Sequence, residues 1–223
     1  MTEITEHLRE IVERVARAAR LAEHPTNVRI VAVSKQKTSA DVAEAYGAGQ
    51  RDFGESYVQE AAPKIDALRG LDIEWHFIGA LQTNKTRLVA EKFHWVHTVD
   101  RAKIAARLNG QRPHFAPPLN VLIQVNQARE PQKSGASPDE VPSLAREIAA
   151  FPHLKLRGLM TIPPASADPT PYFHELAALQ AHLRADGFAL DTLSMGMSAD
   201  FEKAIAAGSN CVRIGTAIFG PRA

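Results

Sequence analysis

The sequence has 223 residues, 45% of them hydrophobic and 23% charged, and its formal net charge is +1. A chain so near neutrality has no overall positive field to hold a polyanion, so we expect no nucleic-acid partner. No window approaches the roughly 18 apolar residues of a membrane span, and the residues from Met1 lack the basic and apolar regions of a secretory leader, so we expect a cytoplasmic protein without a membrane partner.

The chain begins with an amphipathic pattern and continues with a strand that ends in lysine. Apolar residues recur at helical spacing from Ile4 to Ala19, and this helix is expected to stop before His24-Pro25. The first strongly apolar run, from Val28 to Lys35, follows. Lysine suits a buried strand end only if its amine has a role there, so Lys35 is either a solvated loop residue or a desolvated amine poised to form a Schiff base.

After a second helix from Ser39 to Ala45, short apolar strands alternate with helical stretches. The further strands are expected at 52–54, 73–78, 95–99, 119–125, 154–162, 192–193 and 211–214, with helices at 56–68, 84–92, 101–108, 138–150, 171–185 and 199–207. Eight strands alternating with helices are typical of a closed parallel (β/α)8 barrel of the TIM type. An open doubly wound sheet is the alternative, but no Gly-x-Gly-x-x-Gly stretch follows the first strand.

The chain contains no linker of the kind that separates domains. We therefore expect one α/β barrel domain over residues 1–223, with residues 1–24 forming a helix that packs on the barrel, and no second domain. Cys211 is the single cysteine, so an intrachain disulfide is excluded. His94 and His97 could suggest a metal pair, but no third ligand is evident and we expect no metal. A monomer is expected because no exposed apolar stripe stands out.

Polar residues at the carboxyl ends of barrel strands converge on one mouth, where site residues gather. Besides Lys35, the candidates at these ends are Ser56, His76, Ser194, Met195, Gly215 and Thr216. The loops after strands seven and eight commonly hold a phosphate, and the stretches 194–198 and 215–217 offer small residues, amides and hydroxyls for one. His76 could instead be a hydrogen-bonded core residue, and Met195 could pack against a ring or fill a gap.

Arg213 lies inside the last strand and points into the barrel if Val212 and Ile214 face the helices. One interpretation is a structural ion pair with a strand carboxylate such as Glu55. The other is a permanent donor to a heteroaromatic nitrogen. A lysine amine, a phosphate cradle and a ring-nitrogen donor together describe a site for pyridoxal 5′-phosphate held as a Schiff base.

Many ordered segments resemble the pyridoxal-phosphate homeostasis protein family, and they span nearly the whole chain. They include Val31-Ala32-Val33-Ser34-Lys35, Phe53-Gly54-Glu55, Trp75-His76-Phe77-Ile78-Gly79, Lys133-Ser134-Gly135, Arg157-Gly158-Leu159-Met160, Leu193-Ser194-Met195-Gly196-Met197-Ser198 and Val212-Arg213-Ile214-Gly215-Thr216. The resemblance implies an alanine-racemase-like barrel with pyridoxal phosphate on Lys35. It also implies that Ser194, Gly215 and Thr216 hold the phosphate and that Arg213 faces the pyridine nitrogen.

One position departs from the family pattern. Ser56 stands where the family usually has asparagine after Phe-Gly-Glu, near the phenolic side of the cofactor. A serine hydroxyl is shorter than an asparagine amide and could make this contact through water.

Three classes of function follow from these residues. The first, which we favour, is a carrier in vitamin B6 homeostasis with no catalytic residues of its own; it binds the reactive aldehyde reversibly and passes it to enzymes that lack the cofactor. The second is an amino-acid racemase, which needs an acid or base opposite Lys35, and Tyr57 is the only plausible one among the three tyrosines. The third is a structural module with a vestigial barrel that binds no cofactor.

Overall fold

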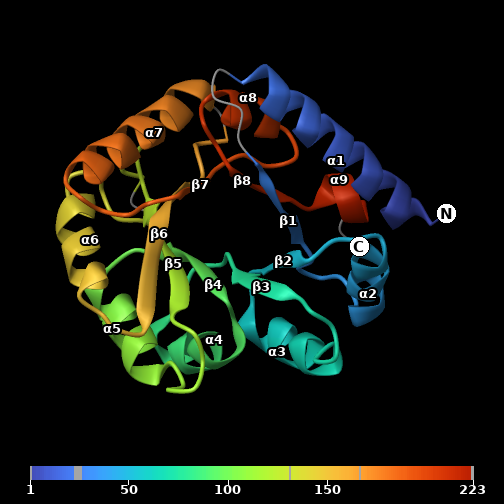
Figure 1. Cartoon of the computed structure of the whole chain (residues 1–223), viewed down its shortest axis with the longest axis horizontal. Helices are drawn as coiled ribbons and strands as arrows, with labels where there is room; N and C mark the ends of the chain where they lie inside the picture. The colour runs from blue at the N-terminus through green and yellow to red at the C-terminus, as the bar shows by residue number, and fades with distance from the viewer. Residues whose placement is uncertain (1, 23–26, 131, 166, 222–223) are drawn as a thin grey trace.

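The computed structural model describes residues 2–22, 27–130, 132–165 and 167–221. Eight parallel strands pair in chain order and close into a barrel, with β8 beside β1 (Figure 1). The strands are β1 (Arg29–Val33), β2 (Asp52–Glu55), β3 (Glu74–Phe77), β4 (Trp95–Val99), β5 (Leu119–Val125), β6 (Leu154–Thr161), β7 (Thr192–Ser194) and β8 (Cys211–Ile214). The predicted closed barrel is confirmed, and the open sheet is wrong because β1 pairs with both β2 and β8.

Helices surround the strands in an outer ring (Figure 1). They are α2 (Ser39–Gly47), α3 (Val58–Ala67), α4 (Thr86–Lys92), α5 (Ala102–Gln111), α6 (Val141–Ala149), α7 (Thr170–Ala185), α8 (Phe201–Ala206) and α9 (Thr216–Phe219), with a 3-10 turn, η1 (Thr83–Lys85), before α4. Within the described ranges, no helix has both the length and the apolar character needed to cross a membrane.

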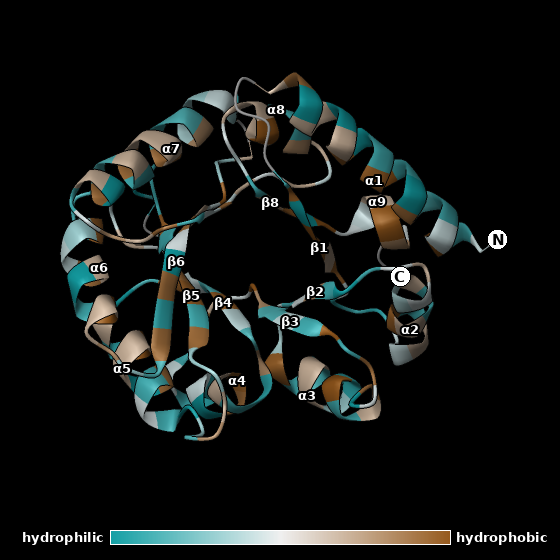
Figure 2. Ribbon diagram, in the orientation of Figure 1, coloured by the Kyte–Doolittle hydropathy of each residue, from teal (hydrophilic) through white to brown (hydrophobic). Residues whose placement is uncertain are grey.

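The N-terminal helix α1 (Glu3–Leu21) covers the barrel beside α8 and α9. It buries Leu8, Ile11 and Val15, and hydrophilic residues alternate with them along its length (Figure 2). Each buried side chain of this size contributes about 1.5–3 kcal/mol relative to an exposed one, which explains why the helix docks on the barrel. The helix ends at Leu21, and the next residue, Ala22, is extended, so the predicted end before His24-Pro25 is confirmed.

Apolar and polar residues separate onto the two sides of the barrel wall. Val212 and Ile214 belong to the large apolar core between strands and helices, whereas Arg213 between them is buried on the other side, inside the barrel. His76, His97 and other inward-facing polar side chains are also fully buried there. The predicted inward direction of Arg213 is therefore confirmed. The barrel interior combines these polar side chains with a small apolar cluster of Trp95, Leu122 and Met160, in which Trp95 stacks on His76.

Candidate functional site

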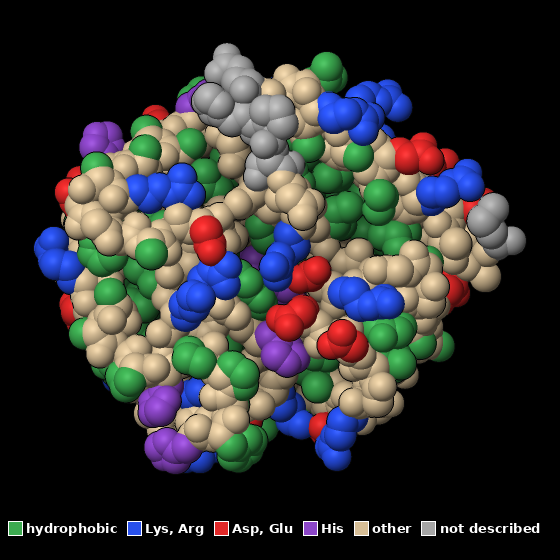
Figure 3. Space-filling model, viewed as in Figure 1, with side chains coloured by type: hydrophobic (Ala, Val, Ile, Leu, Met, Phe, Trp, Pro, Cys, Tyr) green, Lys and Arg blue, Asp and Glu red, His purple; other side chains and the backbone are tan. Residues whose placement is uncertain are grey.

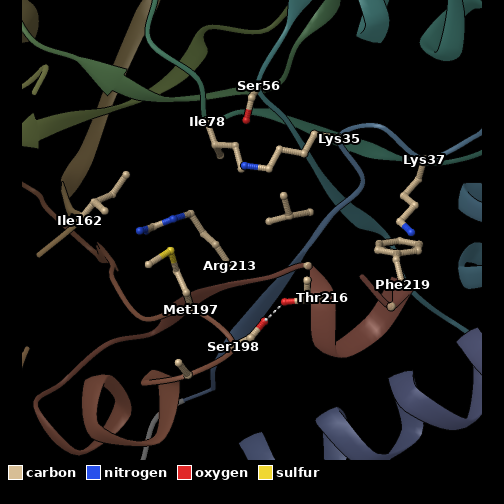
Figure 4. A pocket seen from close by; sticks show the side chains of 14 residues that line it. Lys35, Lys37, Ser56, Ile78, Ile162, Met197, Ser198, Arg213, Thr216 and Phe219 are labelled. Atoms are coloured by element: carbon tan, nitrogen blue, oxygen red, sulfur yellow. Dashed lines mark hydrogen bonds between the residues drawn. The ribbon is translucent and has the colours of Figure 1, made fainter. Parts of the chain in front are cut away.

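A cavity of about 340 Å³ opens at the carboxyl ends of the strands (Figure 4). Its lining includes residues that the sequence predicted for the mouth, namely Lys35, Ser56, Arg213, Gly215 and Thr216. Two further cavities, of about 240 and 450 Å³, adjoin it, because the first shares Ile78 and Ile162 with it and the second shares Lys35 and Ser56. The mouth thus holds three adjoining cavities, and Lys35 lines two of them.

A tight turn after β1 places Lys35 in the cavity. The strand ends at Val33, two residues earlier than the apolar run suggests, and the Lys37 amide then donates to the Ser34 carbonyl at 3.1 Å. Gln36 adopts a left-handed backbone with φ of 62°, which reverses the chain directly after Lys35. Lys35 is half-buried as a result, and its amine extends between Ile78 and Ser56 (Figure 4).

Lys37 also borders the cavity, but its amine is directed elsewhere. Its Nζ donates to the Pro221 carbonyl at 3.0 Å, and Figure 4 shows this amine beside the Phe219 ring rather than beside Lys35. Of the two neighbouring lysines, Lys35 is therefore the one whose amine reaches into the cavity.

A buried ion pair supports the turn that carries Lys35. Lys64 of α3 donates to Glu55 Oε1 at 2.7 Å and to the Ser34 carbonyl at 2.8 Å, and Ser34 Oγ donates to the same Glu55 oxygen at 2.6 Å. Burial raises the pKa of Glu55, and the charge of Lys64 opposes that shift. Sequence reasoning considered Glu55 as a partner of Arg213 but missed Lys64, because a helical lysine is normally exposed.

Arg213 reaches the cavity from inside the barrel and makes three hydrogen bonds to neutral acceptors. Nη1 donates to the Ser194 carbonyl at 2.8 Å and to Ser194 Oγ at 2.7 Å, and Nη2 donates to the Thr161 carbonyl at 2.9 Å. The predicted alternative, an ion pair between Arg213 and Glu55, is wrong because Arg213 donates to Ser194 and Thr161, whereas Glu55 pairs with Lys64. Burial lowers the pKa of the Arg213 guanidinium from its ordinary value.

The structure does not bring Ser194, Met195 or His76 to the cavity. All three are completely buried, and the cavity lining does not include them. Ser194 lies beneath Arg213 with its hydroxyl 2.9 Å from His97 Nδ1, and His76 lies deeper in the barrel, within hydrogen-bond distance of His97 and Asp52. Their expected direct contacts with a cofactor therefore lack support from this geometry.

The chain leaves the barrel interior only after Gly196, two residues after the end of β7, where the sequence predicts that the mouth begins. Gly196 has a φ of 94°, its carbonyl accepts the Arg213 amide at 3.0 Å, and a Cβ on it would lie 2.6 Å from Ala204 Cβ. This position requires glycine for both reasons. The loop beyond it brings Met197, which is 39% exposed, and Ser198 to the mouth in place of Met195 and Ser194.

Hydroxyl and amide groups from the last two loops meet at one end of the cavity. Thr216 Oγ1 donates to Ser198 Oγ at 3.4 Å, and this contact joins the loop after β7 to the first turn of α9 (Figure 4). Because the first N–H groups of a helical turn have no acceptor within that turn, Thr216 and Ala217 offer main-chain donors beside these hydroxyls. This end of the cavity has the chemistry of an anion site.

Ser56 is half-buried and lines the same two cavities as Lys35, of about 340 and 450 Å³. Gly79, after β3, passes so close that a Cβ on it would lie 2.0 Å from the Ser56 carbonyl oxygen, so glycine is needed for this approach. Tyr57 lines the adjoining cavity and is 54% exposed.

The two histidines considered as a metal pair have other partners. The Trp75 amide donates to His94 Nδ1 at 2.9 Å, whereas His97 contacts His76 and Ser194. No group of three or more His, Cys, Asp or Glu side chains suited to a metal occurs in the described part of the chain. Cys211 is buried, and burial raises the pKa of its thiol to about 11.

Comparison with known proteins places this barrel in a family. Residues 7–223 match the family model for the alanine racemase N-terminal domain. A pyridoxal phosphate homeostasis protein of Pseudomonas aeruginosa is 50% identical over 223 residues, covering 100% of this chain and 97% of the relative. The chain belongs to the pyridoxal phosphate homeostasis protein family. The family predicted from the sequence segments is confirmed.

Solved structures agree with this assignment. PipY of Synechococcus elongatus PCC7942 has a TM-score of 0.88 and 34% identity in its structure without PLP, and 0.85 and 33% in its structure with PLP bound. Both matches cover 97% of this chain and 100% of PipY. Alanine racemase of Corynebacterium glutamicum, at 17% identity and a TM-score of 0.73, shares the fold, and this chain covers only 61% of that enzyme.

Proposed function

We propose that this chain binds pyridoxal 5′-phosphate in the 340 Å³ cavity and acts in vitamin B6 homeostasis as a reversible carrier. The observation that carries this proposal is that an amine, a guanidinium and a cluster of hydroxyl and amide donors line one cavity, from Lys35, Arg213 and the Ser198–Thr216 pair. The bound relative PipY and the family name of the curated relative support the same ligand.

The lining residues match the functional groups of the ligand one by one. Lys35 would form a Schiff base with the aldehyde, which is a bond that hydrolysis or another amine reverses. Thr216, the Gly215 backbone and Ser198 would hold the phosphate, and Ser56 would lie near the phenolic side. Ser194 contributes through Arg213 in this scheme, since its hydroxyl is already bonded to the guanidinium.

Arg213 favours a carrier over the pyridoxal enzymes that rely on a protonated ring nitrogen. An arginine side chain keeps its proton at all ordinary pH values, so Arg213 donates a hydrogen bond to a ring nitrogen without transferring the proton. A ring that stays unprotonated withdraws electrons less strongly from a bound amino acid, which slows the chemistry of pyridoxal enzymes. The relatives named as homeostasis proteins, rather than as enzymes, agree with this reasoning.

The racemase alternative depends on Tyr57, which is 54% exposed in the cavity adjoining Lys35. A phenol this open to water is poorly placed to move a proton on a defined face of a substrate. We therefore propose the carrier, acting as a monomer in the cytoplasm and transferring its ligand to enzymes that lack it.

The experiment that tests this function combines binding, transfer and catalysis. We expect the protein to bind pyridoxal phosphate with a visible absorbance band, to restore activity to an added cofactor-free pyridoxal enzyme, and to racemise amino acids no faster than free pyridoxal phosphate. Lys35→Ala should lose the band, and Lys37→Ala should keep it. Rapid racemisation that Tyr57→Phe abolishes would establish the racemase instead, and absence of any binding would establish the structural module.

A further inference from the structure

A continuous hydrogen-bond chain crosses the barrel interior from the cavity to the opposite end. Ser194 Oγ lies 2.7 Å from Arg213 Nη1 and 2.9 Å from His97 Nδ1. His97 Nε2 lies 2.9 Å from His76 Nδ1, and His76 Nε2 lies 2.9 Å from Asp52 Oδ1. Four hydrogen bonds thus join a guanidinium at the mouth to a carboxylate at the amino end of β2.

The two charged ends fix the direction of every bond in this chain. Asp52 as a carboxylate only accepts, so His76 Nε2 must carry the proton that it donates, which leaves Nδ1 of the neutral ring as an acceptor. His97 Nε2 therefore donates to His76, and His97 Nδ1 accepts from the Ser194 hydroxyl. Arg213 can only donate, and its Nη1 donates a hydrogen bond to a lone pair of the Ser194 hydroxyl oxygen.

Burial agrees with this arrangement of neutral rings. His76, His97 and Ser194 are completely buried, and Arg213 is 4% exposed. Desolvation lowers the pKa of His76 and lowers the pKa of His97 well below its ordinary value, and the nearby charges of Arg213 and Arg29 act in the same direction on His97. Each neutral ring therefore has one donor and one acceptor nitrogen, as the hydrogen bonds between Asp52 and Arg213 require.

The carboxylate end is itself held in place. Arg29 Nη1 donates to Asp52 Oδ1 at 2.9 Å, and the Arg29 guanidinium lies 4.8 Å from the centroid of the Trp95 ring. Asp52 borders a separate cavity of about 400 Å³ at the amino ends of the strands. Charged and histidine side chains gather near the barrel axis on the face shown in Figure 3.

We propose that Asp52, acting through His76, His97 and Ser194, is a positioning residue that orients the Arg213 guanidinium toward the ligand. Arg213 has five N–H groups, and its bonds to Ser194 and Thr161 use three of them. The ordered Ser194 hydroxyl fixes the guanidinium plane, so that the remaining N–H groups can face a ring nitrogen. Only the effect on ligand binding rests on the proposed function. The directions of the four hydrogen bonds can be measured in the protein without a ligand.

Nitrogen-15 NMR of the cofactor-free protein tests that order directly. We expect His76 and His97 both to be neutral and protonated on Nε2 at pH 7.5, with assignments from the His76→Gln and His97→Gln variants. Asp52→Asn, which keeps the shape but allows donation, should shift a measurable population of both rings to the Nδ1-protonated form. An Nδ1-protonated or charged ring in the parent, or unchanged rings in Asp52→Asn, would overturn the proposal.

A matched pair of variants tests the effect on the ligand. Glutamine at position 97 supplies an amide NH2 donor group and a carbonyl acceptor about as far apart as the two nitrogens of an imidazole, whereas leucine supplies neither. We expect His97→Leu to weaken pyridoxal phosphate binding about 10-fold and His97→Gln to change it less than about 3-fold. Equal affinities for the two variants, both being folded by circular dichroism, would overturn the positioning role. If the parent itself binds no pyridoxal phosphate, the proposed function fails while the NMR result still decides the hydrogen-bond order.

Discussion

Lys64 of α3 donates a hydrogen bond of 2.8 Å to the main-chain carbonyl of Ser34. Because Ser34 immediately precedes Lys35, this bond connects the first helix after β2 to the turn that presents the cavity amine. The same ammonium neutralises Glu55, which is fully buried beside Ser34. The position of Lys35 thus depends on a charge pair in which neither member lines the cavity.

Lys64→Met should destabilise the protein by about 3–5 kcal/mol, because it leaves the Glu55 carboxylate buried without its cation. Urea unfolding at neutral pH measures this change. The double variant Lys64→Met/Glu55→Gln removes the unpaired charge and should recover at least half of the loss. A single variant as stable as the parent would show that the pair contributes nothing to the turn.

Stability should fall as the pH drops below about 6.5, because the folded state holds His76 and His97 neutral while the unfolded state takes up protons there. Their lowered pKa values mean that the stabilisation is complete above the unfolded pKa and is lost as the pH falls toward the folded pKa. Each ring contributes a slope that rises to at most about 1.4 kcal/mol per pH unit below the unfolded pKa.

The matched variant His97→Gln isolates this effect. Its free energy of unfolding, measured with urea between pH 5.5 and 7.5, should depend less steeply on pH than that of the parent, since one titrating ring is gone. The surface variant Ala181→Gln on α7 is the control and should keep the parent slope, because Ala181 is exposed and the substitution removes no titrating group. Identical slopes for His97→Gln and the parent would contradict the neutral buried ring.

Arg213→Ala should cost roughly 2–4 kcal/mol of stability, because it leaves the Ser194 hydroxyl and the carbonyls of Ser194 and Thr161 buried without their donor. This reason differs from the one that the sequence suggested, in which Arg213 pairs with Glu55 and its removal leaves that carboxylate buried without a partner. Thermal unfolding measures the loss, and Arg146→Ala on the exposed side of α6 should change stability by less than about 0.5 kcal/mol. Equal melting temperatures for the Arg213 variant and the parent would refute its role in the barrel interior.

Thr216→Val should weaken pyridoxal phosphate binding by about 10-fold, because it removes the hydroxyl that meets Ser198 while keeping the side-chain shape. Thr216→Ser keeps the hydroxyl and should bind within about 3-fold of the parent. Titration with pyridoxal, which lacks the phosphate, separates the causes: its affinity should be the same for the parent and the valine variant. If Thr216→Val lost pyridoxal affinity by the same factor, the phosphate would not bind at Thr216.

The sequence predicted the barrel and the family because both depend on patterns that run along the chain. Apolar runs alternate with helical stretches, and candidate site residues lie at or just after strand ends, with Gly215 directly after β8 and Lys35 two residues after β1. The same reasoning misplaced Ser194 and Met195, because a strand of three residues, Thr192–Ser194, shows no alternation that separates the interior from the mouth. A shift of four residues exchanges Ser194 for Ser198, and a shift of two exchanges Met195 for Met197.

Contacts between distant strands could not be read from the sequence. The hydrogen-bond chain draws one residue each from β2, β3, β4, β7 and β8, so no local spacing marks Asp52 or His97 as its members. Lys64 was missed for a related reason, since its partner Glu55 belongs to a different element and burial of a lysine becomes visible only in the packed structure.

Reductive trapping tests the central claim most directly. The protein is saturated with pyridoxal phosphate, treated with borohydride, digested, and mapped by mass spectrometry. We predict one phosphopyridoxyl group per chain, attached to Lys35, and no such product at Lys37 or in the Lys35→Ala variant. Modification of Lys37 instead, or of many surface lysines at similar yield, would contradict the assignment of the cavity to this ligand.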